Sequence, residues 1–276
     1  MNRSMNTLQQ SHIVQPREAP TETTSDLLPA TNRADLHLHT VASDGLATIE
    51  QVLEQVAQTG QLGIVAVTDH DRMFAPAQAR QLERDFGIGV IVGEEVSTQE
   101  GHLLALFIHK ELPAGRPAAE TIAAIHAQGG LCVAAHPYDW LVSSLGKAGL
   151  RHRCLPRGGV ADGRDWAFDA IETVNTGITW PAWVANAMAG RVADELGLPG
   201  TGGSDAHTLA TVGQGWTMFP GTTTDDLYRA IQHGTVTAHG RPWSAAQFLE
   251  FYQLTLRQRS LRGALRLALA NIALTA

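Results

Sequence analysis

Histidine is unusually frequent in this 276-residue sequence, which has twelve histidines but only two lysines, Lys110 and Lys147. Imidazole is the side chain most often used as a metal ligand or proton shuttle near neutral pH. Six of the histidines stand in short motifs with carboxylates. These motifs supply nine candidate metal ligands: His37, His39, Asp44, His70, Glu95, His102, His136, Asp205 and His207. We give no metal role to the other six histidines.

The spacing of two motifs fits shared coordination of one ion. His37 and His39 are two residues apart, and side chains at this spacing on a strand face the same way. Both imidazoles can then reach one ion, while Leu38 points into the packing. Asp205 and His207 repeat the spacing. Each pair alone is equally consistent with two polar strand residues.

The motifs also follow apolar runs that we expect to be strands. Residues 68–71, 93–95 and 136–137 each come directly after such a run, and His102 stands at the entrance of the run 103–107. Burying ionisable groups there is costly unless they bind something or face water. Because the carboxyl ends of parallel strands converge on one rim, we expect the nine residues to collect there.

Nine ligands are too many for a single tetrahedral zinc ion, which takes four. They fit two or three divalent ions with Glu95 as a bridge. Mixed imidazole and carboxylate ligands suit Zn²⁺, Mn²⁺ or Fe²⁺ rather than Ca²⁺. We therefore expect a cofactor of two or three such ions.

Apolar runs alternate with helical patterns along the chain, which predicts an α/β fold with a mostly parallel sheet. About seven such units suit a distorted (β/α)7 TIM-like barrel better than an open sheet. The expected helices span 49–60, 76–86, 118–127, 181–196 and 225–232. The expected strands span 34–39, 63–67, 89–92, 103–107, 131–134, 170–174 and 198–202.

Composition divides the chain into three parts: a disordered N-terminal tail over 1–32, a barrel over 33–243 and an amphipathic helical extension over 244–276. Leucines alternate with arginines in the extension, which we expect to pack on the barrel or to join a homo-oligomer. The irregular segment 139–165 is rich in glycine and arginine. It is a solvated loop or a lid with Arg151, Arg153, Arg157 and Arg164.

The charge and apolar content exclude several classes of protein. Lys and Arg number 20 and Asp and Glu 27, giving a net charge of −7. This balance argues against a surface that coats nucleic acid, so we expect no stable nucleic-acid complex. No run approaches the roughly 20 apolar residues of a membrane span. Cys132 and Cys154 cannot build a disulfide framework, and we expect Cys132 to be a buried thiol. Without a secretory signal, the expected location is cytoplasmic.

The ordered motifs resemble the PHP (polymerase and histidinol phosphatase) phosphoesterases over residues 34–242. The resemblance rests on HLH followed by Asp44, then TDHD, GEE with a later histidine, AHP and SDAH. It implies a distorted seven-stranded barrel with a cluster of two or three ions. By this resemblance, one ion is held by His37, His39, Glu95 and Asp205. Glu95 bridges to a second ion on His102 and His136, and a third binds Asp44, His70 and His207.

Two positions bear on the substrate that the resemblance implies. Family members with aspartate at the place of Asp44 are similar to small phosphatases that act on nucleotides. Many nucleotide-hydrolysing members also have an arginine shortly after the His-Pro motif, where this chain reads Tyr138-Asp139-Trp140. The phosphate clamp expected there is therefore missing or supplied elsewhere.

We interpret the chain as a metal-dependent hydrolase of a phosphate ester, with a small phosphomonoester or nucleotide as substrate. A metal-bound hydroxide is the expected nucleophile, and no general acid can be identified. The ions supply the positive charge that this lysine-poor chain lacks. Candidate substrate contacts are Arg72, Asn175 and Arg241.

Two other functions fit part of the pattern. An amidohydrolase-type barrel that cleaves C–N or C–O bonds also begins with HxH and ends with aspartate, but its binuclear forms usually need a bridging strand-end lysine. A non-catalytic metal-binding barrel used for interaction is the second alternative. Degeneration of that kind should remove ligands, whereas all nine are present.

Overall fold

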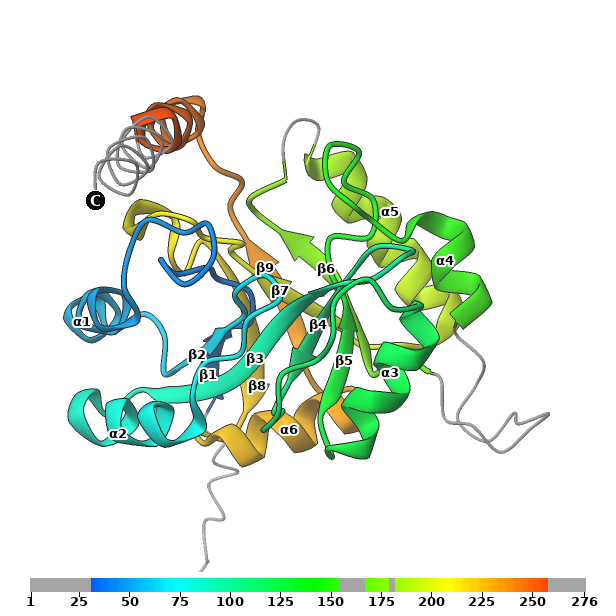
Figure 1. The fold of residues 1–276 in the computed structure, drawn as a ribbon, viewed down its shortest axis with the longest axis horizontal. Coiled ribbons are helices and arrows are strands. Elements are labelled where there is room, and N and C mark those ends of the chain that lie inside the picture. Colours follow the sequence, from blue (N-terminus) through cyan, green and yellow to red (C-terminus); the bar gives the residue numbers. More distant parts are fainter. Residues whose placement is uncertain (1–30, 154–166, 179–181, 258–276) are drawn as a thin grey trace, which may run out of the picture.

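A computed structural model describes residues 31–153, 167–178 and 182–257 (Figure 1). Helices surround a single sheet, whose strands are β1 (Thr31–Asp35), β2 (Ile64–Val67), β3 (Gly89–Ser97), β4 (His102–Leu106), β5 (Leu131–Ala134), β6 (Ala170–Asn175), β7 (Gly200–Gly203), β8 (Gly215–Pro220) and β9 (Thr237–Gly240). The helices are α1 (Ile49–Thr59), α2 (Pro76–Phe86), α3 (Ala118–Ala127), α4 (Gly146–Arg153), α5 (Ala182–Leu196) and α6 (Thr224–His233), with a 3-10 turn, η1, at Leu209–Thr211.

The sheet curls into a nearly closed barrel, which confirms the expected α/β barrel class. Its strand order is β7-β6-β5-β4-β3-β2-β1-β8-β9, and β7 comes back to meet β8. There the hydroxyl of Thr217 accepts a hydrogen bond from the Gly202 amide at 2.8 Å and donates to the Gly202 carbonyl at 3.0 Å. The carbonyl of Trp216 lies where a Cβ on Gly202 would be, so this contact requires glycine.

The sheet is less parallel than the alternating pattern predicted. β1, β2 and β3 pair in parallel, as do β5, β6 and β7, but β4 is antiparallel to both of its neighbours. β8 is also antiparallel to β1 and β9. The reversal of β4 explains why His102 stands at a strand entrance. Ser97 at the end of β3 pairs with His102, so the start of β4 lies at the rim where β3 ends.

β3 is longer than predicted, because Glu94 and Glu95 lie inside it rather than after it. Its first part pairs with β2 as far as Val92, and from Gly93 onward it pairs with β4. A Cβ on Gly93 would lie 2.9 Å from the carbonyl oxygen of Ala105, so glycine lets β4 approach at this change of partner. Glu95 pairs with Leu104 of β4 on one side and forms a parallel bridge with His70 on the other.

Three strand assignments differ from the sequence expectation. β1 begins at Thr31, within the segment expected as tail, and ends at Asp35, before the His37–His39 motif. β8 and β9 were not expected. β8 alternates between buried and half-buried residues, a usable signal, whereas β9 is mostly half-exposed and has no apolar pattern. The extended chain after β1 still reaches the sheet, because Leu38 forms a parallel bridge with Ala206.

The helices begin and end close to the predicted residues. Thr48 caps α1 through a reciprocal capping box with Gln51, and Gly60 ends it in the left-handed conformation. α2 and α3 have the predicted bounds. α4, by contrast, lies in the segment expected to be irregular. Residues 154–165 of that segment lie outside the described residues.

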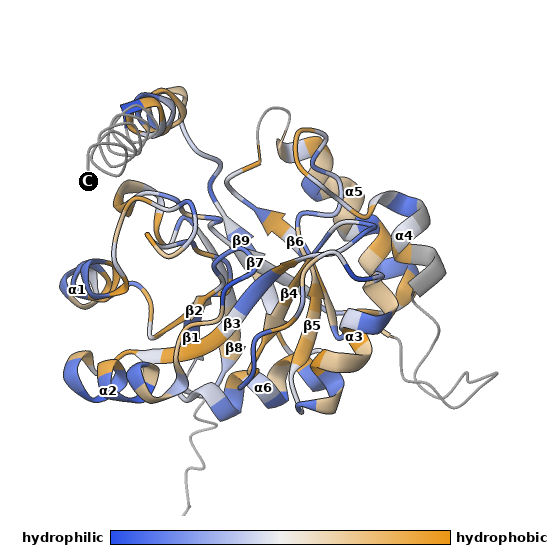
Figure 2. Ribbon diagram, in the orientation of Figure 1, coloured by the Kyte–Doolittle hydropathy of each residue, from blue (hydrophilic) through white to orange (hydrophobic). Residues whose placement is uncertain are grey.

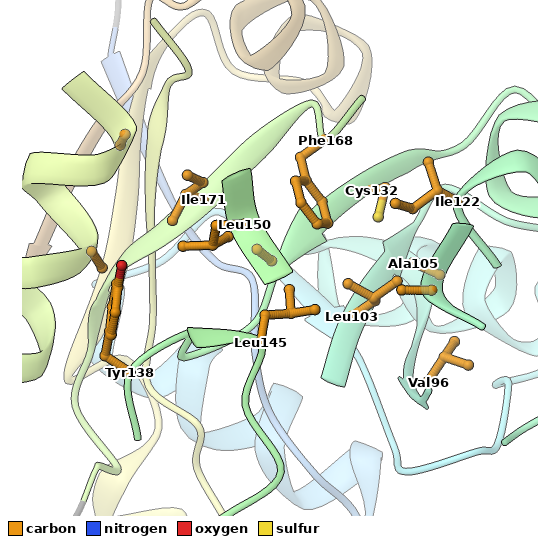
Figure 3. Close-up of a cluster of buried hydrophobic side chains, with 14 of the residues drawn as sticks. Val96, Leu103, Ala105, Ile122, Cys132, Tyr138, Leu145, Leu150, Phe168 and Ile171 are labelled. Atoms are coloured by element: carbon orange, nitrogen blue, oxygen red, sulfur yellow. The ribbon is translucent and has the colours of Figure 1, made fainter. Parts of the chain in front are cut away.

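Figure 2 shows mostly hydrophobic residues along β2 and β5 and hydrophilic residues on much of α2. Buried apolar residues from the strands and the helices form the core clusters. One buried cluster joins Cys132 on β5 with Phe168, Ile122 and Leu103 (Figure 3). Cys132 is fully buried, as predicted. Among the described residues, no helix combines the length and apolarity needed to cross a bilayer.

The C-terminal extension is described as far as residue 257. Residues 245–257 are helical, and Ser244 precedes them as a cap whose hydroxyl accepts from the amide of Gln247. The Gln247 side chain donates to the carbonyl of Ala210 at 3.0 Å, which joins this helix to the barrel. The rest of the expected extension, residues 258–276, lies outside the described residues.

Candidate metal centre

The structure brings all nine predicted ligands together at one rim of the barrel. The backbone after β1 supplies three of them and the backbone after β7 two, while β2, β3, β4 and β5 supply one each, at the end, within or at the start of the strand. The antiparallel strand β4 contributes through its amino end. The set comprises His37, His39, Asp44, His70, Glu95, His102, His136, Asp205 and His207.

Glu95 is the centre of the cluster, and its buried carboxylate contacts five imidazoles. Oε1 lies 2.8 Å from His136 Nε2 and 2.9 Å from His102 Nδ1. Oε2 lies 3.2 Å from His37 Nε2, 3.2 Å from His70 Nδ1 and 3.3 Å from His39 Nε2. Each carboxylate oxygen therefore faces a different group of histidines, as a bridging ligand would.

His37 and His39 face the same space, as their two-residue spacing predicted. Their Nε2 atoms lie 3.2 Å apart, and Oδ1 of Asp205 lies 3.2 Å from His39 Nε2 and 3.6 Å from His37 Nε2. These two nitrogens can share one hydrogen bond, in which the tautomer of one ring donates and the other ring accepts, but that bond leaves the nearby carboxylates without a cation. A divalent cation bound between these nitrogens and the nearby carboxylates would satisfy all of them, so the donor set fits a metal ion.

A second group lies nearer the surface around Asp44. Its carboxylate oxygens lie 3.3 Å from His207 Nε2, 3.5 Å from His39 Nδ1 and 3.9 Å from His70 Nε2. The Asp44 side chain is 53% exposed, whereas those of Glu95 and His37 are fully buried. The cluster thus extends from the barrel interior to the solvent.

Four overlapping sets of donor atoms are close enough to share an ion. They are His37, His39 and Asp205; His37, Glu95 and His136; His70, Glu95 and His102; and His39, Asp44, His70 and His207. Glu95 belongs to two of these sets but not to the set of His37, His39 and Asp205, to which the resemblance also assigns it. The sets also divide the histidines differently, because His102 and His136 fall into separate sets.

The carboxylates give the cluster a strongly negative potential, which a cation would neutralise. Burial lowers the pKa of His37, but the charges of Asp205, Glu172 and Glu95 outweigh it and raise that pKa well above its usual value. Burial likewise opposes the rise in the pKa of His39, which the hydrogen bonds to Asp205 and Glu95 bring to about 10. The pKa values of Glu95 and Asp205 lie well below the usual range, because the surrounding imidazoles overcome burial.

A second layer of polar groups orients the ligands, and its main member, Glu172, was not predicted. Oε1 of this buried β6 carboxylate lies 3.1 Å from His37 Nδ1, and Oε2 accepts from the His136 amide at 2.8 Å. Asn175 donates to Glu172 Oε2 at 3.0 Å and to Asp205 Oδ2 at 3.2 Å. A glutamate in the middle of the strand expected over 170–174 was the available sequence signal.

Two further buried carboxylates hold the backbone that presents the ligands. Asp69 accepts from the Thr40 amide and hydroxyl, both at 2.7 Å, and from the Ser43 hydroxyl at 2.6 Å, which fixes the turn before Asp44. Asp35 accepts from the amides of His37 at 3.3 Å and Ser204 at 2.9 Å, and ties the first and last motifs together. Burial raises the pKa of Asp35 to about 6.

Two of the candidate ligands are among the four described residues other than glycine that have a positive φ. His136 has a φ of 23° and Asp205 a φ of 52°, values that side chains other than glycine rarely adopt. The Asp205 amide donates to the His37 carbonyl at 2.8 Å, which holds that residue in place. Such strain is most often found at functional sites.

A pocket of about 280 Å³ opens above the cluster. Its lining combines seven of the nine candidate ligands with a mostly apolar wall, and comprises Asp44, His70, Glu95, His102, His136, Asp205, His207, Asp139, Leu141, Val142, Gly177, Trp243, Phe248, Phe251 and Tyr252. His37 and His39 do not line it, so a ligand in this pocket would approach the cluster from the Asp44 side.

None of the three predicted substrate contacts lines the pocket above the cluster. Arg72 and Arg241 are exposed and do not line the pocket, and the Arg72 guanidinium lies 3.8 Å from Glu111. Asn175 is fully buried. Its amide nitrogen bonds Glu172 and Asp205, and its amide oxygen accepts from Gly177 and Ile178. Both polar atoms of its side chain therefore have partners inside the protein.

The sequence has two lysines, and both lie away from the site. Lys110 follows β4, Lys147 lies in α4, and both are exposed and absent from the pocket lining. The bridging lysine that binuclear amidohydrolases usually need therefore has no candidate here. The structure defines an α/β barrel whose rim is rich in histidine and carboxylate ligands suited to divalent metals.

Comparison with known protein families identifies the family to which this barrel belongs. The PHP domain family matches residues 35–163, and the PHP-associated family matches residues 183–236. These two ranges include every one of the nine candidate ligands. The chain belongs to the PHP family, a family of metal-dependent phosphoesterases whose members hydrolyse ester bonds.

Individual relatives agree with this assignment. The chain is 35% identical over 125 residues to protein MJ1587 of Methanocaldococcus jannaschii, a match that covers 41% of this chain and 72% of the relative. It is 41% identical over 86 residues to phosphoribosyl 1,2-cyclic phosphate 1,2-diphosphodiesterase of Eggerthella lenta, covering 29% of this chain and 32% of that protein.

A solved structure shares the fold. It is a two-domain protein from Bacteroides vulgatus that contains a predicted PHP-like metal-dependent phosphoesterase. The TM-score is 0.58 at 17% sequence identity, and the match covers 77% of this chain and 66% of the other. At this level of identity the likeness concerns the fold.

Proposed function

We propose that this chain hydrolyses the phosphate ester of a small phosphorylated compound, with a nucleotide or another phosphomonoester as substrate. The convergence of five imidazoles on the Glu95 carboxylate, within 3.3 Å, is the observation that supports this most strongly. The nine candidate ligands would hold two or three Zn²⁺, Mn²⁺ or Fe²⁺ ions. When bound, such ions lower the pKa of a coordinated water and neutralise phosphoryl oxygens.

The residues of the chain have separate tasks in this proposal. His37 and His39 lie beneath the pocket, and Glu172 fixes the ring of His37 from behind. Asp44, His70 and His207 line the open side, where a phosphate would enter. No lysine or arginine lines the pocket within the described part of the chain. The charge of the phosphate would therefore be balanced at the ligand cluster rather than by a side-chain clamp.

A substrate screen tests the proposal. The full chain, stripped with a chelator and reloaded with Mn²⁺ or Zn²⁺, is assayed for phosphate release from nucleoside mono- and bisphosphates and from sugar phosphates. A nitrophenyl phosphodiester and a short oligonucleotide test diesters, which the cyclic phosphodiesterase relative acts on by name. We expect metal-dependent release from a monoester. Failure of every phosphate ester with fully loaded protein would contradict the proposal.

Matched variants separate the site from the remaining histidines. Asp205→Ala and His136→Ala should lose both bound metal and phosphate release, since both side chains contact the central cluster. His109→Ala changes an exposed histidine that does not line the pocket, and it should keep both properties. Equal metal content in all three variants would indicate that the cluster does not bind the ions.

A further inference from the structure

The pocket above the ligand cluster has two chemically different parts. Its floor consists of histidines and carboxylates. Its side wall contains four aromatic residues from a single stretch of ten, namely Trp243, Phe248, Phe251 and Tyr252. We call these four residues the aromatic wall. Trp243 is the last residue of the expected barrel, and the other three lie in the C-terminal extension. All four lie beyond the PHP-associated match, which ends at residue 236.

The aromatic wall is held against the barrel rather than projecting freely from it. The amide of Trp243 donates to the carbonyl of Thr176 at 3.3 Å, and Gln247 donates to the carbonyl of Ala210 at 3.0 Å. The rings also contact one another. The centroid of Trp243 lies 5.1 Å from that of Phe248 and 5.8 Å from that of Phe251. Such edge contacts give the wall a defined shape.

The wall lies directly beside the candidate metal ligands. The ring of Phe251 meets that of His207 edge-on, with centroids 5.3 Å apart. A phosphate bound over the cluster would therefore place the group attached to it next to the aromatic wall. The wall exposes flat apolar surface there, since Tyr252 remains 55% exposed while lining the pocket.

The rest of the lining limits what this neighbouring group can be. Apart from the candidate ligands, Asp139 is the one charged residue in the pocket lining, and it is negative. Within the described part of the chain, the lining contains no lysine or arginine that could bind a second phosphate. Leu141 and Val142 add further apolar surface from the loop after β5. The lining thus suits an uncharged, flat group better than a sugar alone or a second phosphate.

We infer that the aromatic wall determines substrate specificity, by stacking on a flat aromatic ring attached to the phosphate-bearing alcohol. A nucleobase is the main candidate, and a simple aryl group has the same chemistry. This inference rests on the proposed function, because it assumes that a phosphate ester binds at the cluster. It adds a recognition role for the C-terminal extension and argues for monophosphates over bisphosphates.

Adenosine 5′-monophosphate and ribose 5-phosphate test the inference, because both esters have a primary alcohol on ribose and differ by the base. Stacking of one base on aromatic side chains should favour the nucleotide in kcat/KM by roughly 10-fold. Benzyl phosphate distinguishes a simple aryl ester from a nucleotide. Equal or better hydrolysis of ribose 5-phosphate by the wild-type chain would overturn the inference while leaving the proposed function intact.

A second experiment uses variants of the aromatic wall with the same two substrates. Phe251→Leu and Tyr252→Ala should each reduce the preference for the nucleotide over ribose 5-phosphate by roughly 5- to 10-fold. Leu249→Ala, an exposed position on the same helix that does not line the pocket, should preserve it. If the wild-type chain hydrolyses neither ester, calorimetric binding of both compounds tests the aromatic wall alone, and the full panel of phosphate esters tests the proposed function. Equal affinities for the nucleotide and for ribose 5-phosphate would contradict the inferred stacking on the aromatic wall.

Discussion

His37 Nδ1 lies 3.1 Å from Oε1 of Glu172, and both side chains are buried in the barrel. This contact holds the His37 ring so that its other nitrogen faces Glu95 and His39. In metal sites, a carboxylate behind a histidine ligand fixes the ring orientation and raises the basicity of the ligand. Glu172 therefore supports the site without being one of its candidate ligands.

Replacing this carboxylate should weaken metal binding without emptying the site. For Glu172→Gln, we expect the affinity for Mn²⁺ or Zn²⁺ to fall by about 10- to 100-fold, the usual effect of losing such a partner. Chelator competition measures the change. Glu120→Gln on the exposed face of α3 serves as the control. An affinity equal to that of wild type would mean that Glu172 has no positioning role.

Asn175 distinguishes a positioning role from the substrate contact that the sequence suggested. Asn175→Ala removes two hydrogen bonds to carboxylates inside the barrel. We expect the free energy of unfolding to fall by about 1–3 kcal/mol and metal affinity to fall with it. Urea denaturation and metal titration measure the two effects. An increase in KM alone, with normal stability and metal content, would instead support the hypothesis that Asn175 contacts the substrate.

The stability of the metal-free protein should depend on pH in a definite direction. The pKa of His39 rises from 6.5 to about 10 on folding, so the folded chain keeps a proton that the unfolded chain releases. Its stabilising contribution is complete below pH 6.5 and is lost as the pH rises through about 10. Chelator-treated protein should therefore melt at progressively lower temperature across this range.

Bound metal should suppress that loss, because ions replace the protons on the imidazoles and bind more tightly as the pH rises. Thermal melting of metal-free and Mn²⁺-loaded samples over the same pH range checks both statements. A metal-free protein that becomes more stable toward alkaline pH would contradict the assigned direction.

The closure of the barrel depends on Gly202. A methyl group at this position would collide with the carbonyl of Trp216 on β8, so Gly202→Ala should destabilise the fold by about 1–3 kcal/mol. Gly190→Ala is the matched control, because nothing lies near its missing Cβ within α5. Alanine there should stabilise by up to about 1 kcal/mol. Urea denaturation that ranks the two variants in the opposite order would rule out this description of the closure.

The sequence predicted the barrel class and the helices well, because those features depend on local signals. Thr48 and Gly60 mark the ends of α1 by capping chemistry that needs no tertiary contact. β9 was missed because its residues are half-exposed and lack periodicity. The reversal of β4 also could not be read from its apolar run, since a buried strand looks the same in either direction.

The candidate ligands could be predicted from the sequence, but the residues that position these ligands mostly could not. Histidines at strand ends stand out because such residues are expensive to bury without a partner. Glu172 and Asp69 act through contacts with residues far away in the chain, which spacing alone does not reveal. The aromatic wall was missed for a similar reason. Its residues resemble the packing face of an ordinary amphipathic helix until the pocket is seen.

The central claim is that Glu95 joins a centre of at least two divalent ions. Elemental analysis of Mn²⁺-loaded, desalted protein counts the ions per chain, and Glu94→Gln is the matched control for Glu95→Gln. Glu94 is equally buried on the same strand, but its carboxylate accepts from the Leu112 amide instead of facing the histidines. We predict two or three ions in the wild-type chain and in Glu94→Gln, and fewer in Glu95→Gln. No bound metal in the wild-type chain, or equal counts in all three proteins, would contradict the account.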